Sequence, residues 1–172
     1  AVFRKSGLAI WSTSISGGRS GRAISIVDDI VTSPVVDGST VFVANASGRI
    51  TALNLDNGER IWGKPFGTLG NIWPAGDSLF LVNDLSQLVR MDKYSGDIVW
   101  SVQLPSFLKI NPRKSKEVVA HFGPIVASGK VILVSSDKKI RVFNPIDGSL
   151  IDDVRVPSGA TSNPVIADNI LY

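Results

Sequence analysis

The sequence has no cysteine, a single histidine (His121) and a single methionine among its 172 residues. Without cysteine the chain can form no disulfide framework, no thiolate metal site and no cysteine nucleophile. One histidine alone disfavours a histidine-based zinc site or a Ser-His-Asp triad within this chain. Much ordinary enzymology is therefore disfavoured, and we expect no catalytic residue, no metal and no cofactor.

Long apolar runs and a strong charge of one sign are also missing. The longest apolar stretch, residues 117–127, is interrupted and much shorter than the roughly 20 residues of a membrane helix. Residues 1–7 lack the apolar core of a signal peptide. Either the chain is cytosolic, or a targeting segment lies upstream of Ala1. The net charge is only +3, which says little about partners because nucleic-acid-binding proteins cluster their basic charge on one face. We expect no nucleic-acid partner.

What the sequence does contain is an internal repeat. Three copies align without gaps when Pro34, Ile72 and Pro124 share a column. Further columns hold Phe42, Phe80 and Ile132; Asn54, Asp92 and Asn144; Gly58, Gly96 and Gly148; and finally Trp62, Trp100 and Asp152. From first to last column each copy spans the same 28-residue interval. Repeat units are therefore predicted at residues 34–62, 72–100 and 124–152.

Both ends of the sequence contain part of a further copy. Gly7 and Trp11 repeat the spacing from glycine to tryptophan, so residues 1–11 match the end of a unit. Residues 164–172 match the beginning of another unit. The organisation indicates one domain that is part of a larger one, with about three complete units.

Each unit has the pattern of β-strands joined by tight turns. Short runs of β-forming residues, such as Val41–Ala44 and Leu79–Val82, are apolar on both faces, which suits a sheet packed between two others. Glycine supplies the positive φ that the turns near Gly58, Gly96 and Gly148 require. Four-stranded units of about 40 residues are typical of a propeller. The predicted fold is therefore an all-β propeller of antiparallel blades, and we expect a parent propeller of about eight blades.

The segment from Gly48 to Trp62 resembles the tryptophan-docking repeat of the pyrroloquinoline-quinone-type propellers. Residues 92–100 repeat the pattern, and residues 144–152 repeat it with Asp152 in place of tryptophan. The family's tryptophan packs against the neighbouring blade. The resemblance therefore implies structural roles for Trp11, Trp62 and Trp100, and leaves the blade of Asp152 without a conventional indole.

The sequence can be assigned to either of two branches of this superfamily. Quinone-dependent dehydrogenases carry a vicinal cysteine pair and a calcium site, and a fragment of such an enzyme is the alternative interpretation. Residues 32–38, 70–77 and 121–127 are similar to the other branch, the periplasmic lipoprotein B subunits of the machinery that assembles outer-membrane β-barrels. That resemblance implies a non-catalytic scaffold in the periplasm, anchored to the outer membrane through an upstream lipid, with the barrel-inserting subunit's periplasmic repeat domains as partner.

Three polar features remain to be interpreted. In the lipoprotein family, acidic residues of one inter-blade loop bind the partner. Asp29 matches one of those positions, whereas Val31 occupies the next, and we take Asp28 and Asp29 as candidate partner-binding residues; the alternative is an acidic pair that caps a turn. The basic segment 109–116 is interpreted as a solvated loop, with an anionic partner as the alternative. His121 is expected to be a hydrogen-bonded structural residue.

Overall fold

The computed structural model describes residues 1–15, 32–45, 48–68, 70–108, 117–168 and 170–172. Within these residues the chain forms 14 β-strands and no helix. The predicted all-β class is confirmed. No described segment forms a helix that could cross a lipid bilayer. Contacts within the chain divide it into two compact units, Ala1–Leu69 and Gly70–Tyr172, which are described separately.

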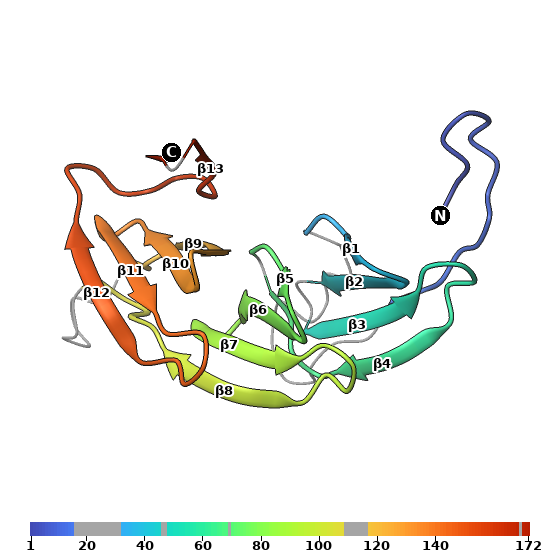
Figure 1. The fold of residues 1–172 in the computed structure, drawn as a ribbon, viewed down its shortest axis with the longest axis horizontal. Coiled ribbons are helices and arrows are strands. Elements are labelled where there is room, and N and C mark those ends of the chain that lie inside the picture. Colours follow the sequence, from blue (N-terminus) through green and yellow to red (C-terminus); the bar gives the residue numbers. More distant parts are fainter. Residues whose placement is uncertain (16–31, 46–47, 69, 109–116, 169) are drawn as a thin grey trace. The chain divides into compact units, whose positions relative to one another are not determined.

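The first unit contains one four-stranded antiparallel sheet in the order β1-β2-β3-β4 (Figure 1). Its strands are β1 (Val35–Asp37), β2 (Thr40–Asn45), β3 (Arg49–Asn54) and β4 (Arg60–Lys64). The turns from β1 to β2 and from β3 to β4 contain Gly38 and Gly58, which adopt positive φ values of 58° and 74°. The strands therefore follow one another as a simple meander.

The second unit contains two further sheets of the same design. One sheet comprises β5 (Trp73–Ala75), β6 (Ser78–Val82), β7 (Gln87–Asp92) and β8 (Ile98–Gln103). The next comprises β9 (His121–Ala127), β10 (Lys130–Ser135), β11 (Lys139–Phe143) and β12 (Leu150–Arg155). A two-stranded hairpin follows, formed by β13 (Ile166–Ala167) and β14 (Ile170–Leu171). Several strands extend a few residues beyond the gapless part of the repeat, because the ladders continue into the sequence between the units.

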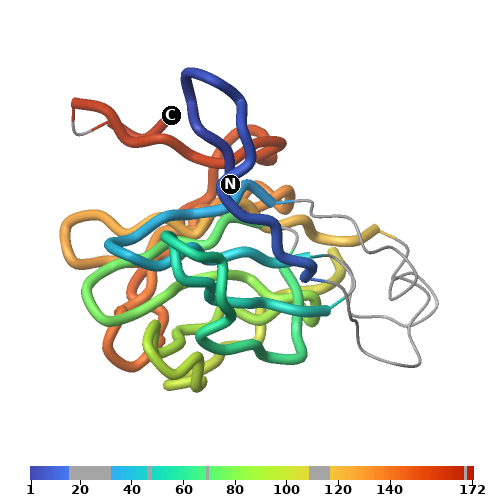
Figure 2. Tube along the Cα trace, turned by 90° about the vertical axis from the view of Figure 1, so that its right-hand side faces the viewer, coloured from blue at the N-terminus to red at the C-terminus, as the bar shows by residue number. Residues whose placement is uncertain are grey.

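The first ten residues form a separate hairpin outside the four-stranded sheet (blue in Figure 2). Val2 and Ala9 form a bridge, and Gly7 closes the turn with a φ of 70°. The chain then leads to Trp11 and Ile15, which pack with β2 and β3. Trp11 and Ile15 therefore belong to the packed part of the first unit, whereas residues 1–10 are exposed.

The three long turns between the third and fourth strands are built alike. The side chain of the residue at the first position, Asn54, Asp92 or Asn144, accepts hydrogen bonds from backbone N–H groups two residues further on. The glycine four residues later donates its N–H to the first residue's carbonyl, at 2.9 Å in each case. Asparagine and aspartate favour such turns because their side chains satisfy the local backbone.

Each unit has its own hydrophobic core. In the first unit, Ile15, Val41, Val43 and Leu53 are buried together. In the second unit, the core joins the two sheets and includes Phe80, Leu88, Val131, Leu133 and Phe143. The second strands of the first two sheets are buried on both faces, as their continuous apolar sequences predict. The core therefore fixes β10 and β11 against the preceding sheet and positions the polar groups at their ends.

Candidate functional site

Trp11 docks on the turn that joins β3 to β4. Its indole Nε1 donates a hydrogen bond to the carbonyl oxygen of Leu55 at 2.8 Å. The ring covers Gly58 so closely that a Cβ added there would lie 2.4 Å from Trp11 Cε3. Thr13 adds a hydrogen bond from Oγ1 to the carbonyl oxygen of Gly58 at 2.7 Å. Glycine is therefore required at this position both for its φ and for the space that the indole occupies.

The same arrangement recurs around Trp100 in the second unit. The indole Nε1 of this residue of β8 donates to the carbonyl oxygen of Pro145 at 3.1 Å. A Cβ on Gly148 would lie 2.8 Å from Trp100 Cε3. Both indoles thus bind the carbonyl three residues before the turn glycine. Arg90 reinforces the second turn, because its Nη1 donates to the Pro145 carbonyl at 3.1 Å as well.

Trp62 and Trp100 each have an aromatic neighbour on the second strand of their own sheet. Phe42 lies against Trp62 and Phe80 lies against Trp100, with ring centroids 6.0 Å apart in both pairs. Trp62 is buried, with 9% of its surface exposed, and Trp100 is partly buried. Gly96 occupies the corresponding turn position of the second sheet, with a φ of 72°. We retain the structural roles of these residues as a prediction that substitution can test.

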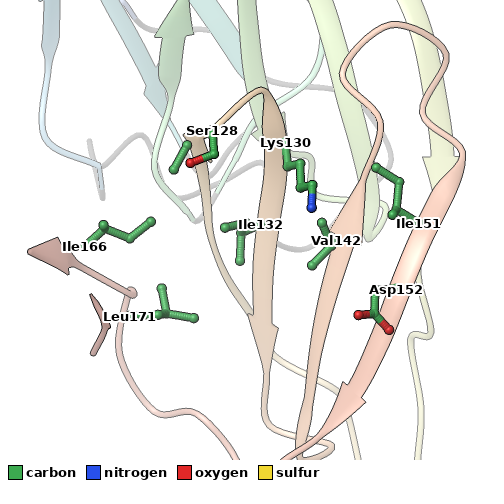
Figure 3. A pocket seen from close by; sticks show the side chains of 9 residues that line it. Ser128, Lys130, Ile132, Val142, Ile151, Asp152, Ile166 and Leu171 are labelled. Atoms are coloured by element: carbon green, nitrogen blue, oxygen red, sulfur yellow. The ribbon is translucent and has the colours of Figure 1, made fainter. Parts of the chain in front are cut away.

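The third sheet replaces both members of this aromatic pair. Ile132 stands at the phenylalanine position and Asp152 at the tryptophan position, where Asp152 faces Val142 on the neighbouring strand. A hollow of about 400 Å³ lies on this face, with Ile132, Val142 and Ile151 on one side (Figure 3). Ile166 and Leu171 of the following hairpin line its other side (Figure 3). The sheet thus exposes an apolar surface where the other two sheets carry an indole.

A chain of polar groups with its centre, Ser135 and Arg141, buried links the third sheet to the connection that precedes it. Arg141 of β11 forms an ion pair with Asp137 and donates from Nη1 to Ser135 Oγ at 3.0 Å. Ser135 Oγ lies 2.8 Å from His121 Nδ1. His121 Nε2 lies 2.9 Å from the carbonyl oxygen of Pro105. The contacts run without interruption from a carboxylate in a turn to the backbone of the inter-sheet connection.

The hydrogen-bond partners determine which nitrogen carries the proton when the His121 ring is neutral. The Pro105 carbonyl can only accept, so Nε2 carries the proton and Nδ1 accepts from the Ser135 hydroxyl. Burial lowers the pKa of His121 below its ordinary value of 6.5, against the opposing effect of the hydrogen bond to Pro105. The neutral ring at pH 7 therefore links Ser135 to the connection, and the hydrogen bonds expected for His121 are present; its structural role stays a prediction.

This polar chain is not arranged for nucleophilic catalysis. The Ser135 residue has no exposed surface, and its hydroxyl is held between His121 and Arg141. A substrate carbonyl consequently has no route to it. Among the described residues, no three His, Cys, Asp or Glu side chains gather where a metal ion could bind.

Two of the sequence predictions lie outside the described residues. Asp28 and Asp29 belong to residues 16–31, and the basic segment 109–116 is likewise not described. The structure therefore places neither the candidate partner-binding pair nor the basic run. The polar chain around Arg141 was not predicted, because no spacing in the sequence connects Asp137 and Ser135 with Pro105.

Four-stranded antiparallel meanders in tandem, with indoles docked on turn glycines, define a β-propeller built from tryptophan-docking repeats. A family model described as outer membrane protein assembly factor BamB matches residues 1–102. The chain belongs to this family, and the resemblance drawn from its sequence is confirmed.

Relatives with this name match nearly the whole chain. The factor BamB from Shewanella oneidensis is 24% identical over 172 residues, which cover 99% of this chain and 41% of that protein. The Escherichia coli factor BamB is 25% identical with the same coverage. The crystal structure of BamB from Moraxella catarrhalis superposes with a TM-score of 0.65 and 18% identity, covering 83% of this chain and 42% of that one. The chain thus spans about two fifths of the length of these relatives and has the fold of part of a propeller.

Proposed function

We propose that this chain belongs to a non-catalytic scaffold subunit of the machinery that assembles outer-membrane proteins. The observation that carries the proposal is family membership together with the match over 99% of the chain to relatives named as assembly factors. A scaffold of this kind works in the periplasm, held at the outer membrane by a lipid anchor elsewhere in the protein. Its partner is the barrel-inserting subunit, which it contacts through that subunit's periplasmic repeat domains.

A propeller suits such a role because its blades form a rigid frame and its connections are free to vary. Binding residues are commonly carried by loops that a rigid scaffold positions. In this chain the connections before the first and third sheets are the long ones, residues 12–33 and 104–120. The sequence resemblance assigns partner binding to the first of them, through Asp28 and Asp29.

The direct test is the affinity of the complete protein for the partner's periplasmic domains. We compare the wild type with the double variant Asp28→Ala/Asp29→Ala. The matched control is Asp56→Ala, which removes an exposed carboxylate from the β3–β4 turn. If the acidic pair is desolvated in the complex, its loss costs about 2–5 kcal/mol of binding, whereas exposed carboxylates contribute less than about 1 kcal/mol.

The results separate the proposal from its alternatives. A selective loss in the double variant, larger at low salt than at moderate salt, supports an interface at this loop. Binding that is equal in all three proteins reduces the pair to a turn cap. Failure of the wild type itself to bind those domains would overturn the assembly role.

A quinone-dependent dehydrogenase remains the alternative from the sequence, and the names of the relatives favour the scaffold. Calorimetric titration of the complete protein with pyrroloquinoline quinone and Ca²⁺ distinguishes the two. Saturable binding of the quinone would contradict the scaffold proposal.

A further inference from the structure

A hollow of about 390 Å³ lies between the third sheet and the connection that precedes it. One wall is apolar and consists of Pro105, Phe107 and Leu108 from the connection. The other wall is basic and consists of Lys139 and Arg155, with the ion pair of Arg141 and Asp137 beside them. All of these residues belong to the second unit, and none belongs to the candidate partner-binding loop.

The basic wall carries charge that its own sheet does not neutralise. Lys139 of β11 and Arg155 of β12 are direct cross-strand partners, an arrangement in which like charges repel. Lys139 is paired with Asp153 at 2.6 Å. The exposed Arg155 side chain has no hydrogen bond or ion pair to any residue that the structure describes. One guanidinium is therefore left to bind an anion at the edge of the hollow.

The apolar wall is held in position before any ligand arrives. Phe107 and Val118 form a bridge, and Leu108 N–H donates to the Glu117 carbonyl at 3.0 Å. The Pro105 carbonyl is fixed by His121 at 2.9 Å. Phe107 and Leu108 nevertheless remain 46% exposed, so the connection presents apolar side chains to solvent on a fixed frame. Such preorganisation reduces the entropy that binding must overcome.

We propose that this hollow binds a short acidic peptide segment of a partner protein, with an apolar side chain against Phe107 and a carboxylate on Arg155. A concave site of this size is at the small end of ligand pockets and accepts a short segment of chain. A bilayer surface is flat and does not enter such a hollow. Duplex nucleic acid requires an extended basic stripe, whereas Asp137 and Asp153 interrupt this one.

The proposal does not depend on a role in outer-membrane assembly. The sequence between Leu108 and Glu117 contains four basic residues and no acidic one, a composition that favours an acidic ligand. Those residues lie outside the described part of the chain and are not included in the proposed site. The binding groups are Arg155 and Lys139 for carboxylates, and Phe107 and Leu108 for the apolar side chain.

The test measures binding of a fluorescein-labelled peptide, DLEFDE, to the complete protein by fluorescence anisotropy. The neutral peptide NLQFNQ and the acidic peptide DSESDE, which lacks apolar side chains, serve as ligand controls. Arg155→Gln and Phe107→Ser remove one group from each wall. Arg60→Gln, which replaces an exposed arginine on the fourth strand of the first sheet, is the matched control.

We expect saturable binding of DLEFDE that weakens with added salt, and weaker binding of both control peptides. Arg155→Gln is expected to weaken it about fivefold or more, the change that corresponds to an ion pair of about 1 kcal/mol. Arg60→Gln is expected to bind as the wild type does. No saturable binding, or equal affinity in Arg155→Gln and the wild type, would overturn the proposal. Preferential, Arg155-dependent binding of phosphatidylglycerol vesicles or of a DNA oligonucleotide would overturn it in favour of that class of ligand.

Discussion

Replacing Trp100 by alanine tests the role of the docked indole directly. The indole packs against Phe80 at 6.0 Å and donates to the Pro145 carbonyl at 3.1 Å. Truncation of a large aromatic side chain costs about 3–5 kcal/mol in a buried site. Because Trp100 is only partly buried, we expect the free energy of unfolding to fall by about 3 kcal/mol, the lower end of this range.

The hydrogen bond accounts for the smaller part of this loss. The Pro145 carbonyl still accepts from Arg90 Nη1 at 3.1 Å after the indole is removed. It is therefore not left without a donor, and the lost bond contributes about 1 kcal/mol. Trp100→Phe, which keeps a ring and removes the N–H, is expected to lie between the wild type and Trp100→Ala.

A double-mutant cycle with Gly148→Ala identifies the contact itself. The added Cβ would lie 2.8 Å from Trp100 Cε3, at a φ of 75° that disfavours alanine. Removing the indole relieves the clash with Trp100 but leaves the contact with Val102 Cγ2 at 2.9 Å and the unfavourable φ. The two changes should therefore be less destabilising together than the sum of their separate effects. We expect a coupling of at least about 1 kcal/mol.

The assay is urea unfolding of the complete protein, monitored by far-UV circular dichroism, which reports mainly on the β-sheet backbone. Tyr94→Ala is the control for loss of an aromatic ring, since Tyr94 is 65% exposed. Equal destabilisation by Trp100→Ala and Tyr94→Ala, or strict additivity in the cycle, would refute a docking role for the indole.

Three further predictions concern turns and titratable groups. Gly58→Ala should destabilise the protein by about 1–3 kcal/mol more than Gly38→Ala in thermal unfolding, because both glycines have positive φ but only Gly58 lies against Trp11; equal losses would contradict this. Hydrogen bonds, first from the backbone of the turn, lower the pKa of Asp92 below its ordinary value of 3.8, so its stabilising effect is present above that pH and is lost as the pH falls through the folded-state value. Asp92→Asn keeps the acceptor and should therefore reduce the loss of Tm on acidification, and an unchanged pH profile would argue against it. Burial lowers the pKa of His121, so the unfolded chain takes up its proton first and stability falls as the pH drops below 6.5; His121→Ala should be destabilising at pH 7 and less so, relative to the wild type, at about pH 5, and a constant difference across this range would contradict the assignment.

The turns could be predicted from the sequence because each depends on residues close together in the chain. Gly58, Gly96 and Gly148 adopt the positive φ that the repeat required of them. The strands before these turns were harder to interpret in detail. Residues 49–53 mix polar and apolar side chains, yet Thr51 and its neighbours Ile50 and Ala52 are all buried. Alternation specifies little where both faces of a sheet are covered.

The hollow beside Phe107 and the polar chain around Arg141 could not be predicted, because their residues come together only in the folded protein. Arg141 occupies the middle of an alternating strand, where a charged residue usually faces water. It is instead 5% exposed, because Asp137 and Ser135 receive its guanidinium. His121 and Pro105 join this group from positions 14 and 30 residues before Ser135 in the sequence. No local pattern connects residues at such separations.

The replacement of the aromatic pair in the third sheet affects how the repeat can be assembled. Trp11 and Trp100 each dock on a turn of the sequence repeat that follows their own. Such a contact is head-to-tail, because one repeat contributes its tryptophan and the next contributes its β-turn. Such heterologous joints close into a ring only when the rotation per unit fits, and each joint adds its own increment of stability. In the third repeat, Ile132 and Asp152 replace the aromatic pair, so this repeat presents a different surface to the one that follows it. The third repeat therefore cannot be exchanged for either of the other two without changing the surface that it offers to the next repeat.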